Sequence, residues 1–442
     1  MATQYAITGA NAREIGAAIE RGVAEGAFAP GSALPPVRRL AERLGVSAGT
    51  VAAAYQELRR RGIVVTRGRG GTVVAAAPAV GSRRPPRVPE GVRDLAGGHP
   101  DPAFLPTIRP PREIPPHGGS HRGNPRVPEL EDRARAWFAR DGVPADGVTF
   151  ANGALDCVSR LLSCELAPGD AVAVEDPGFH HVLDLVPALG LRAVPVTVDD
   201  EGLRPAELAR ALRTGARAVV CSPRGQSPRG ARFGPKRRAE LLAVLAAHPE
   251  VLVVEDDHNA EIADPDGVPL HSLCTGGLPR WAQVRTVSKS LAVDLRWAAV
   301  ACDPVTLARH DGRLLLTSGW ISHIIQESVL ALLTDPETAR LTAEARAAYA
   351  ARRTALLTAL DGHGITAHGA SGLNVWVPVR DESAVVNGLR TRGWWVAAGA
   401  RFRTATPPAV RITTAALPPA DGHRLAADLA AVTQESAGTY GG

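Results

Sequence analysis

The sequence predicts a multidomain protein in which a small α+β domain of the winged helix-turn-helix type precedes a larger α/β domain. Three observations carry this prediction. Residues 11–75 contain three helical segments followed by two short β-branched runs. Residues 76–93 are rich in Ala, Pro, Arg and Gly and have no periodicity, as expected of an extended linker. From Asp94 onward, apolar runs alternate with long helical stretches, which is the pattern of a mostly parallel sheet covered by helices.

The domain boundaries follow from these changes of pattern. A chain of 442 residues is expected to form roughly two or three domains. We assign residues 8–76 to the winged domain, residues 77–93 to the linker and residues 94–436 to the α/β domain.

Local signals predict each element of the front domain. Apolar residues recur at helical spacing from Ile15 to Val23 in the first helix. A second helix covers Val37–Leu44 and stops at Gly45. Ser47 caps a third helix that reaches about Arg61. Two strands are then expected on either side of a wing rich in Gly and Arg, at Ile63–Thr66 and Thr72–Ala75.

Positive charge is concentrated in this front domain. Residues 11–75 hold ten arginines and five glutamates, so their balance is 10 − 5 = +5, which equals the formal surplus of the whole chain. Basic residues lie both at the start of the second helix and on the wing, and a generally solvated face does not explain that distribution. A localised basic surface predicts binding to nucleic acid.

The α/β domain contains seven apolar runs that are expected to be strands. They are Gly147–Phe150, Ala171–Val174, Arg192–Val196, Ala218–Cys221, Val251–Val254, Arg285–Val287 and Ala298–Ala301. A long helix, Thr338–Leu360, is expected to lead into a smaller α/β subdomain that ends near Thr433.

The composition excludes several classes of protein. The five cysteines are scattered and form no CxxC pair, which argues against a disulfide framework or a zinc site and fits a reducing cytoplasm. No apolar run reaches about 18 residues, so no membrane span is expected. The first twenty residues include Glu14 and Glu20 and do not resemble a signal peptide.

The chain has only two lysines among its fifty basic residues, Lys236 and Lys289. An amine that must lose its proton and attack a carbonyl has to be lysine, because the arginine guanidinium stays protonated. Lys236 lies at an expected helix start, and we interpret it as a lysine that remains by chance in a chain whose codon usage favours arginine. Lys289 is therefore the candidate for covalent chemistry.

The surroundings of Lys289 predict a pyridoxal phosphate site. Asp256 ends a β-run about thirty residues earlier, and Arg296 follows seven residues later. Such a carboxylate keeps the pyridine nitrogen protonated, the lysine forms the internal aldimine, and arginine with a hydroxyl such as Ser288 holds the phosphate. Asp256 and His258, two apart on a strand, are expected on one face, with Asp257 pointing the other way as a structural residue.

Further pieces of the chain fit this site. Gly153 and Ala154 open a helix after a strand, where backbone N–H groups cradle phosphate. Phe179 follows another strand and can lie on the cofactor ring. Ser227 stands in a turn after a strand, and Arg411 in a short β-run suits a substrate carboxylate.

The front domain resembles the GntR-type DNA-binding domain over about 65 residues. The residues that carry this resemblance are Leu34-Pro35-Pro36-Val37-Arg38-Arg39-Leu40-Ala41, Leu44-Gly45-Val46-Ser47, Thr50-Val51, Ala54-Tyr55, Leu58, Gly62 and the wing Gly70-Gly71-Thr72. The resemblance implies that Arg38, Ser47, Thr50, Arg67 and Gly68 approach double-stranded operator DNA. One departure is Ala48-Gly49, where the family usually has a basic residue after the capping serine. A winged helix used only for protein contacts is the alternative.

The whole chain resembles the MocR subfamily of GntR regulators, in which a winged helix precedes a domain like the fold-type I aminotransferases. The segment Asp94–Pro102, with Phe104-Leu105-Pro106 and Pro128-Glu129-Leu130, matches the start of that domain. The resemblance implies that Lys289 carries the aldimine and that Asp256 contacts the pyridine nitrogen. It further implies phosphate contacts from Ser288, Arg296, Gly153 and Ala154, a ring contact from Phe179 and an effector carboxylate at Arg411.

Four positions depart from the family pattern. His258 replaces a tyrosine that bonds the ring hydroxyl, and Ser227 replaces an asparagine. Leu155-Asp156 stand in a segment that is usually rich in Gln, and His121-Arg122 stand where a tyrosine from a partner subunit is expected. These changes argue against efficient catalysis more than they argue against cofactor binding. A metal cluster at Glu255–His258 and metal ligation by His180-His181 are the less favoured interpretations.

The resulting hypothesis is a cytoplasmic, pyridoxal phosphate-dependent transcription regulator that senses an amino compound or the cofactor itself. A homodimer is expected, because two-fold operators need paired heads. The resemblance implies that this dimer is domain-swapped, with the front domain of one subunit over the back domain of the other. The first alternative is a working aminotransferase that carries a DNA-binding domain. The second is a regulator whose back domain has lost the cofactor and serves only for dimerisation.

Overall fold

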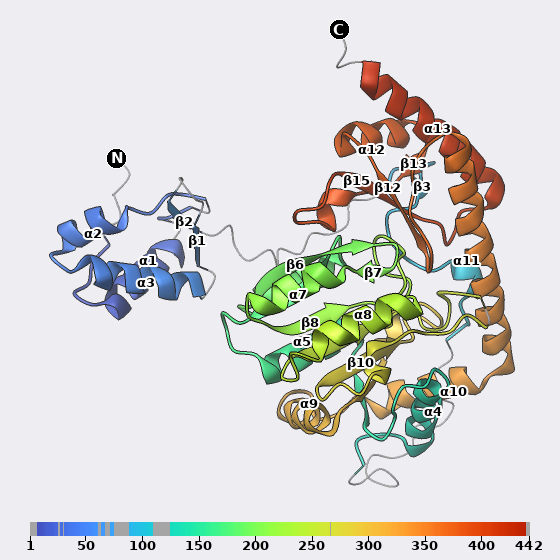
Figure 1. Ribbon diagram of the computed structural model, residues 1–442, viewed down its shortest axis with the longest axis horizontal. Helices are drawn as coiled ribbons and strands as arrows, with labels where there is room; N and C mark the ends of the chain where they lie inside the picture. Colours follow the sequence, from blue (N-terminus) through green and yellow to red (C-terminus); the bar gives the residue numbers. More distant parts are fainter. Residues whose placement is uncertain are drawn as a thin grey trace. The chain divides into compact units, whose positions relative to one another are not determined.

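The computed structural model describes residues 7–24, 27–29, 31–60, 63–66, 71–74, 88–108, 124–265 and 267–438 (Figure 1). Among the described residues, no helix is long and apolar enough to cross a membrane.

The front domain has the winged helix-turn-helix plan. Its elements are α1 (Ala12–Ala24), α2 (Val37–Leu44), α3 (Ala48–Arg60) and the antiparallel pair β1 (Val64–Thr66) and β2 (Thr72–Val74). Gly45 ends α2 in the left-handed conformation with φ of 66°. Ser47 caps α3, because its hydroxyl accepts a hydrogen bond from the Thr50 N–H at 3.0 Å. The expected strands and the second and third helices thus lie within one residue of their predicted bounds.

The core of this domain is the predicted inner face of the helices. Ile15, Val51 and Leu58 are fully buried and pack with apolar residues of α2 and the two strands. Tyr55 is also buried and donates its hydroxyl to the Pro35 carbonyl at 2.7 Å, which ties α3 to the entry of α2.

The start of the second domain differs slightly from the predicted boundary. Arg93, the last residue assigned to the linker, lies in β3 (Arg93–Asp94) and pairs in parallel with β13 (Trp394–Trp395). Residues 77–87 of the predicted linker lie outside the described residues.

The large sheet of the α/β domain has the order β4-β11-β10-β9-β8-β5-β6-β7. The strands are β4 (Val148–Ala151), β5 (Ala171–Asp176), β6 (Arg192–Asp199), β7 (Gly202–Leu203), β8 (Ala216–Cys221), β9 (Leu252–Asp256), β10 (Trp281–Thr286) and β11 (Ala298–Cys302). The central strands β5, β8, β9 and β10 are parallel, as predicted, whereas β11 runs antiparallel to both β10 and β4. The short strand β7, which forms a hairpin with β6, was not predicted.

Helices bury both faces of this sheet. They are α4 (Pro128–Ala139), α5 (Ala154–Glu165), α6 (His180–Ala188), α7 (Pro205–Arg213), α8 (Pro235–Leu245), α9 (Pro304–Thr317) and α10 (His323–Thr334). Every residue of β9 and β10 is buried. The polar residues Gln283 and Arg285 of β10 donate hydrogen bonds to Glu255 and Asp257 inside the domain, which allows their burial. Lys236 lies at the start of α8, where its side chain is 86% exposed and lies 4.0 Å from Glu240.

The long helix α11 (Pro336–Gly362) leads into a small subdomain (Figure 1). There β12 (Asn374–Pro378), β15 (Ala409–Thr413) and β14 (Ala397–Ala398) form an antiparallel sheet, with α12 (Glu382–Thr391) and α13 (Pro419–Gly438) packed on it. Short 3₁₀ turns occur at Pro102–Phe104, Leu273–Thr275, Val293–Leu295 and Gly399–Arg401.

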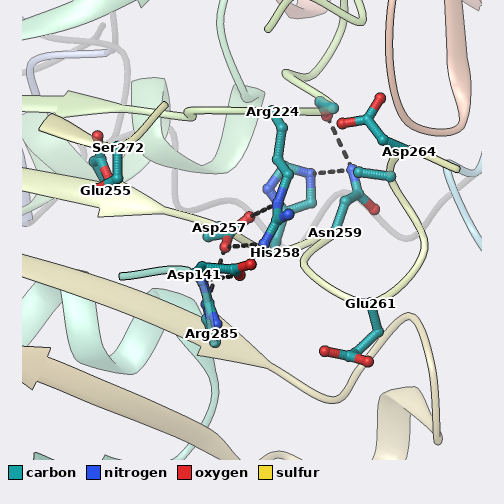
Figure 2. Close-up of polar contacts among 12 residues, drawn as sticks. Asp141, Arg224, Glu255, Asp257, His258, Asn259, Glu261, Asp264, Ser272 and Arg285 are labelled. Carbon is teal, nitrogen blue, oxygen red and sulfur yellow. Dashed lines mark hydrogen bonds and ion pairs between the residues drawn. The ribbon is translucent and has the colours of Figure 1, made fainter. Parts of the chain in front are cut away.

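A buried ion network holds the strand ends of the large sheet together (Figure 2). Asp257, which follows β9, accepts hydrogen bonds from Arg224 through both carboxylate oxygens at 2.8 Å and from Arg285 of β10 at 3.0 Å. Asp141, after α4, accepts from the same two arginines at 3.0 and 2.6 Å. Asp257 and Arg285 have no exposed side-chain surface. This network confirms that Asp257 is structural, as its predicted orientation suggested.

The charges in the network balance, which allows them to be buried. Burial alone would raise the pKa of Asp257, but the charges of Arg224 and Arg285 outweigh it and hold that pKa below its ordinary value. The Arg285 guanidinium also lies over the Phe138 ring at 4.9 Å, so α4 is fixed to the sheet by the same group.

Replacing Asp257 with asparagine should destabilise the α/β domain by about 3–5 kcal/mol, because two buried arginines would keep their charge and lose a partner. Denaturant unfolding followed by circular dichroism measures this loss. Glu337→Gln, which removes an exposed partner of Arg340, is the control and should change stability little. An Asp257→Asn protein as stable as the parent would show that the network contributes no net stability.

Candidate cofactor-binding site

The carboxyl ends of the parallel strands surround a cavity of about 330 Å³. The cavity lies within the α/β domain, where ligands of open α/β sheets usually bind. Nine of the predicted site residues line it, namely Ala154, Phe179, Ser227, Asp256, His258, Ser288, Lys289, Arg296 and Arg411. Residues that lie far apart in the sequence therefore meet at one cavity in the fold.

Lys289 lies in the loop after β10 with its amine inside the cavity. The Nζ donates a hydrogen bond to the Gly98 carbonyl at 2.6 Å. Burial and the charge of Arg411 lower the pKa of Lys289 to about 8, and the carboxylate of Asp256 only partly opposes them. A substantial share of this amine is therefore neutral near pH 8 and able to act as a nucleophile.

Asp256 is the last residue of β9 and faces the same cavity. Its side chain is buried, and burial raises the pKa of its carboxyl while His258 opposes that rise. The Oδ1 atom is buried and has no hydrogen-bond partner within the described residues. A buried acceptor without a donor is costly, so this oxygen suits a ligand that brings an N–H group, such as a protonated pyridine.

Gly153 and Arg296 form a cradle at the start of α5. Gly153 has φ of 88°, and a Cβ there would lie 2.7 Å from the Arg296 guanidinium, so only glycine fits. Because Gly153 has no side chain to cap α5, the first N–H groups of the helix remain available to an anion. The hydroxyls of Thr286 and Ser288 lie 2.9 Å apart beside this point. These groups fit a phosphate.

β9 ends at Asp256, so His258 lies two residues beyond the strand. Its side chain still lines the cavity, as that of Asp256 does. The Asn259 amide nitrogen donates to the Gly225 carbonyl at 2.9 Å and lies 3.0 Å from His258 Nε2 (Figure 2). Since a carbonyl can only accept, this nitrogen is a donor, and Nε2 must accept from it. The proton of neutral His258 is then on Nδ1, which lies 3.3 Å from the Asp256 carbonyl and 3.7 Å from its carboxylate.

Both ring nitrogens of His258 thus have neighbours within the domain, and the one that carries the proton faces the main-chain carbonyl of Asp256. The Phe179 ring is nearly parallel to the imidazole, at 16° and 6.3 Å between centroids. The predicted contacts of His258 with a ring hydroxyl and of Phe179 with the cofactor ring stay predictions.

Arg411 of β15 also lines the cavity. Its guanidinium lies over the Phe402 ring at 4.4 Å and 3.5 Å from the Ser227 hydroxyl, and its Nε has no partner. Burial, with the charge of Arg401, lowers the pKa of Arg411 to about 9. The arginine lacks a carboxylate partner among the described residues, which is consistent with a binding role toward an anionic ligand.

Sequence reasoning missed several residues that line the cavity. These are Gly98, His99, His180, His181, Asn259, Thr286, Val293, Leu373 and Asn374, with Gly97 and Leu155 at its edge. The histidine pair was interpreted as part of a helix face, and α6 does begin there. Most of the others come from segments with no strand-end or motif signal, so only tertiary packing could identify them.

The acidic run before His258 does not converge on one point. Glu255 accepts from the Leu273 N–H at 2.6 Å and from Gln283 at 2.9 Å, away from Asp256 and Asp257. No group of three or more His, Cys, Asp or Glu residues suited to a metal occurs in the described part of the chain.

On the winged domain, the described DNA-contact candidates lie at the starts of two helices, α2 and α3. Arg38 is exposed on α2, and Ser47 is exposed at the N-terminus of α3, with its hydroxyl 2.8 Å from that of Thr50. Arg67 and Gly68 of the wing, like His121 and Arg122, lie outside the described residues.

Comparisons with known proteins match both parts of the chain. Residues 119–429 match the model of aminotransferase class I and II, and residues 11–74 match that of bacterial regulatory proteins of the gntR family. The chain is 39% identical to the vitamin B6 salvage pathway transcriptional repressor PtsJ of Salmonella typhimurium, over 96% of this chain and 98% of that protein. It is 29% identical to the pyridoxine biosynthesis transcriptional regulator PdxR of Corynebacterium glutamicum, over 76% and 75% of the two chains.

The fold has close counterparts among solved structures. An archaeal alanine:glyoxylate aminotransferase superposes with a TM-score of 0.68 at 20% identity, over 78% of this chain and 91% of that one. At this identity, the likeness confirms the predicted fold of the second domain.

The assignment of His258 predicts opposite outcomes for two amides. Asparagine places its amide near the Nδ1 position, beside Asp256, whereas glutamine places it near Nε2, beside Asn259. His258→Gln should weaken pyridoxal phosphate binding by about tenfold, since Asp256 loses one donor, and His258→Asn should retain more of the affinity. Absorbance titration with the cofactor measures both. His363→Gln at the end of α11 is the control, and the reverse order of the two amides would contradict the assignment.

The lowered pKa of Lys289 predicts the pH dependence of cofactor attachment. Only the neutral amine reacts, and its fraction rises with pH and levels off above the pKa, so the attachment rate should rise up to about pH 8 and then level off. An ordinary lysine would keep rising toward about pH 10.4. Stopped-flow absorbance measures the rate. Lys289→Arg should abolish attachment and Lys236→Arg should leave it unchanged, and a rate still rising above pH 9.5 would refute the shift.

Proposed function

Since this chain belongs to the MocR-type GntR regulators, in which a winged helix precedes an aminotransferase class I and II domain, we propose that it is a transcription regulator whose operator binding responds to pyridoxal 5′-phosphate. The supporting observation is the completeness of the site. A buried amine, an unpaired buried carboxylate oxygen and a glycine-arginine cradle lie around one cavity.

Each of these groups has a role toward the cofactor. When bound, pyridoxal phosphate supplies an aldehyde that reacts with amines and a ring that withdraws electrons. Lys289 provides the amine, and Asp256 accepts a hydrogen bond from the protonated ring nitrogen. Arg296 and the N-terminus of α5 hold the phosphate, and His258 orients Asp256.

The cofactor itself is the effector that we favour. PtsJ and PdxR are named for vitamin B6 salvage and pyridoxine biosynthesis, and we propose that this chain also regulates a gene of vitamin B6 metabolism. A small amine or amino acid acting at Arg411 is the second possibility, because that arginine has no ion pair of its own. A working aminotransferase would use the same residues and is distinguished by steady turnover of an amino donor with a keto acid.

We also propose a homodimer, which would pair two DNA-binding heads on a two-fold operator. Four large apolar side chains are exposed within ten residues of chain, at the end of α9 and the start of α10: Leu315 (66%), Leu316 (83%), Trp320 (54%) and Ile324 (38%). An apolar cluster of this kind usually marks a protein interface. We call these residues the apolar patch. The cysteines, all free, suit a reducing compartment such as the cytoplasm.

The regulator hypothesis predicts that pyridoxal phosphate changes the operator affinity of the wild-type protein. Lys289→Ala should bind the operator normally and lose this response. Arg38→Ala should weaken operator binding by about tenfold and reduce its salt dependence by about one unit of slope. Fluorescence anisotropy with a duplex selected by the protein measures these effects, with Lys236→Ala as a charge control. An operator affinity that ignores the cofactor would refute the proposal.

A charge in the apolar patch should separate the subunits. Leu316→Arg is expected to raise the dimer dissociation constant by at least about tenfold, because a desolvated cation would replace an apolar contact. Sedimentation velocity over a range of concentrations measures this. Val305→Arg, at the other end of α9 and 49% exposed before substitution, is the matched control. A Leu316→Arg protein that remains dimeric would place the interface elsewhere.

A further inference from the structure

The main chain of Ala96–Gly98 contacts two cationic groups of the cavity, Lys289 and Arg411. We call this segment the strap. The Gly98 carbonyl accepts a hydrogen bond from Lys289 Nζ at 2.6 Å, and the Ala96 carbonyl accepts from the Arg411 guanidinium. The amine that the cofactor needs and the arginine suited to a ligand anion therefore both contact the same short piece of chain.

The strap is fixed at its two ends. On one side, Leu95 is buried in the subdomain core, and its N–H donates to the Trp395 carbonyl at 2.8 Å. On the other side, the Asp101 carboxylate accepts from Arg352 at 2.8 Å, and the Asp101 N–H donates to the Tyr349 hydroxyl at 2.9 Å. Because Leu95 and Asp101 are held in this way, the residues between them can move while the two ends stay in place.

Gly98 holds the strap against Arg411. Its φ is 67°, and a Cβ at this position would lie 3.2–3.4 Å from three atoms of the guanidinium. Its N–H donates to the Thr413 hydroxyl at 3.1 Å, and Thr413 in turn donates to Asn374 at 3.1 Å. A side chain at this position, or the loss of the Thr413 hydroxyl, would loosen the strap.

The strap provides weak partners for strong groups. A neutral carbonyl satisfies an ammonium or a guanidinium less well than a carboxylate or a phosphate does, because an anionic acceptor adds the attraction of opposite charges to the hydrogen bond. A ligand that engages Lys289 and presents an acid to Arg411 would therefore displace both carbonyls.

We propose that the strap is an internal competitor for the ligand-binding groups of the cavity, and that its displacement is the change that ligand binding passes to the linker. The inference rests on the proposed function. The strap follows β3 directly, and β3 follows the part of the predicted linker that begins at Val88. A shift of Ala96–Gly98 therefore acts on the chain at the point where the linker joins the domain.

The test uses the full-length protein and pyridoxal 5′-phosphate as the probe. Thr413→Val keeps the shape of the side chain and removes the acceptor for the Gly98 N–H. The variant should bind the cofactor about three- to tenfold more tightly, the worth of one hydrogen bond. Its operator affinity without cofactor should move toward that of the loaded wild type. Gly98→Ala loosens the strap from the other side, leaves Thr413 intact and should shift both measurements in the same direction.

Thr433→Val is the matched control, because its hydroxyl bonds only within α13, to the Leu429 and Ala430 carbonyls. If the wild type responds to the cofactor while both strap variants match it in cofactor and operator affinity, the strap inference is wrong and the regulator proposal stands. If the wild type itself does not respond, the regulator proposal fails. In that case, tighter cofactor binding by the variants would still support competition by the strap, and unchanged binding would overturn it.

Discussion

The buried pairing of two arginines with two aspartates beneath the cavity is the interaction on which the rest of the site depends. Arg224 follows β8, Asp257 follows β9 and Arg285 belongs to β10, while Asp141 comes from the end of α4. Adjacent parallel strands could otherwise let their ends diverge, because hydrogen bonding stops there. The network holds the main chain immediately beside Asp256, His258 and Lys289, so small errors in any of these positions are suppressed. Its balanced charges also explain why Asp257 can be buried after the end of β9.

Much of this architecture could be predicted from the sequence, because the relevant signals are local. Gly45 and Ser47 mark a turn between two helices through backbone conformation and capping, which depend on neighbours only. The apolar runs Val251–Val254 and Ala298–Ala301 indicate burial on both faces without reference to their partners. The constellation of Asp256, Lys289 and Arg296 was found by residue type and position after strands, and each of them lines one cavity. Chemistry that requires a specific residue type is thus readable even when the residues are far apart in the chain.

The remaining features depend on contacts between residues that no local sequence signal connects. The orientation of the His258 proton depends on the contact with Asn259, whose amide also donates to the Gly225 carbonyl. Gly225 lies in a loop thirty-odd residues earlier in the chain. The strap uses main-chain carbonyls, which every residue has, so no pattern distinguishes Ala96 or Gly98 as contacts of Lys289 and Arg411. The antiparallel direction of β11 is likewise absent from its composition, since an antiparallel strand buried on both faces has the same apolar sequence as a parallel one.

The scarcity of lysine has a practical consequence for any study of this chain. Aldehydes such as pyridoxal phosphate also form adducts with surface lysines, and most proteins carry many of them, which blurs stoichiometry. Here only Lys236 on α8 and the α-amino group compete with the buried Lys289. Reduction of the bound adduct and peptide mapping would therefore give an occupancy for one position almost free of background, so that the protein carries its own single-site reporter.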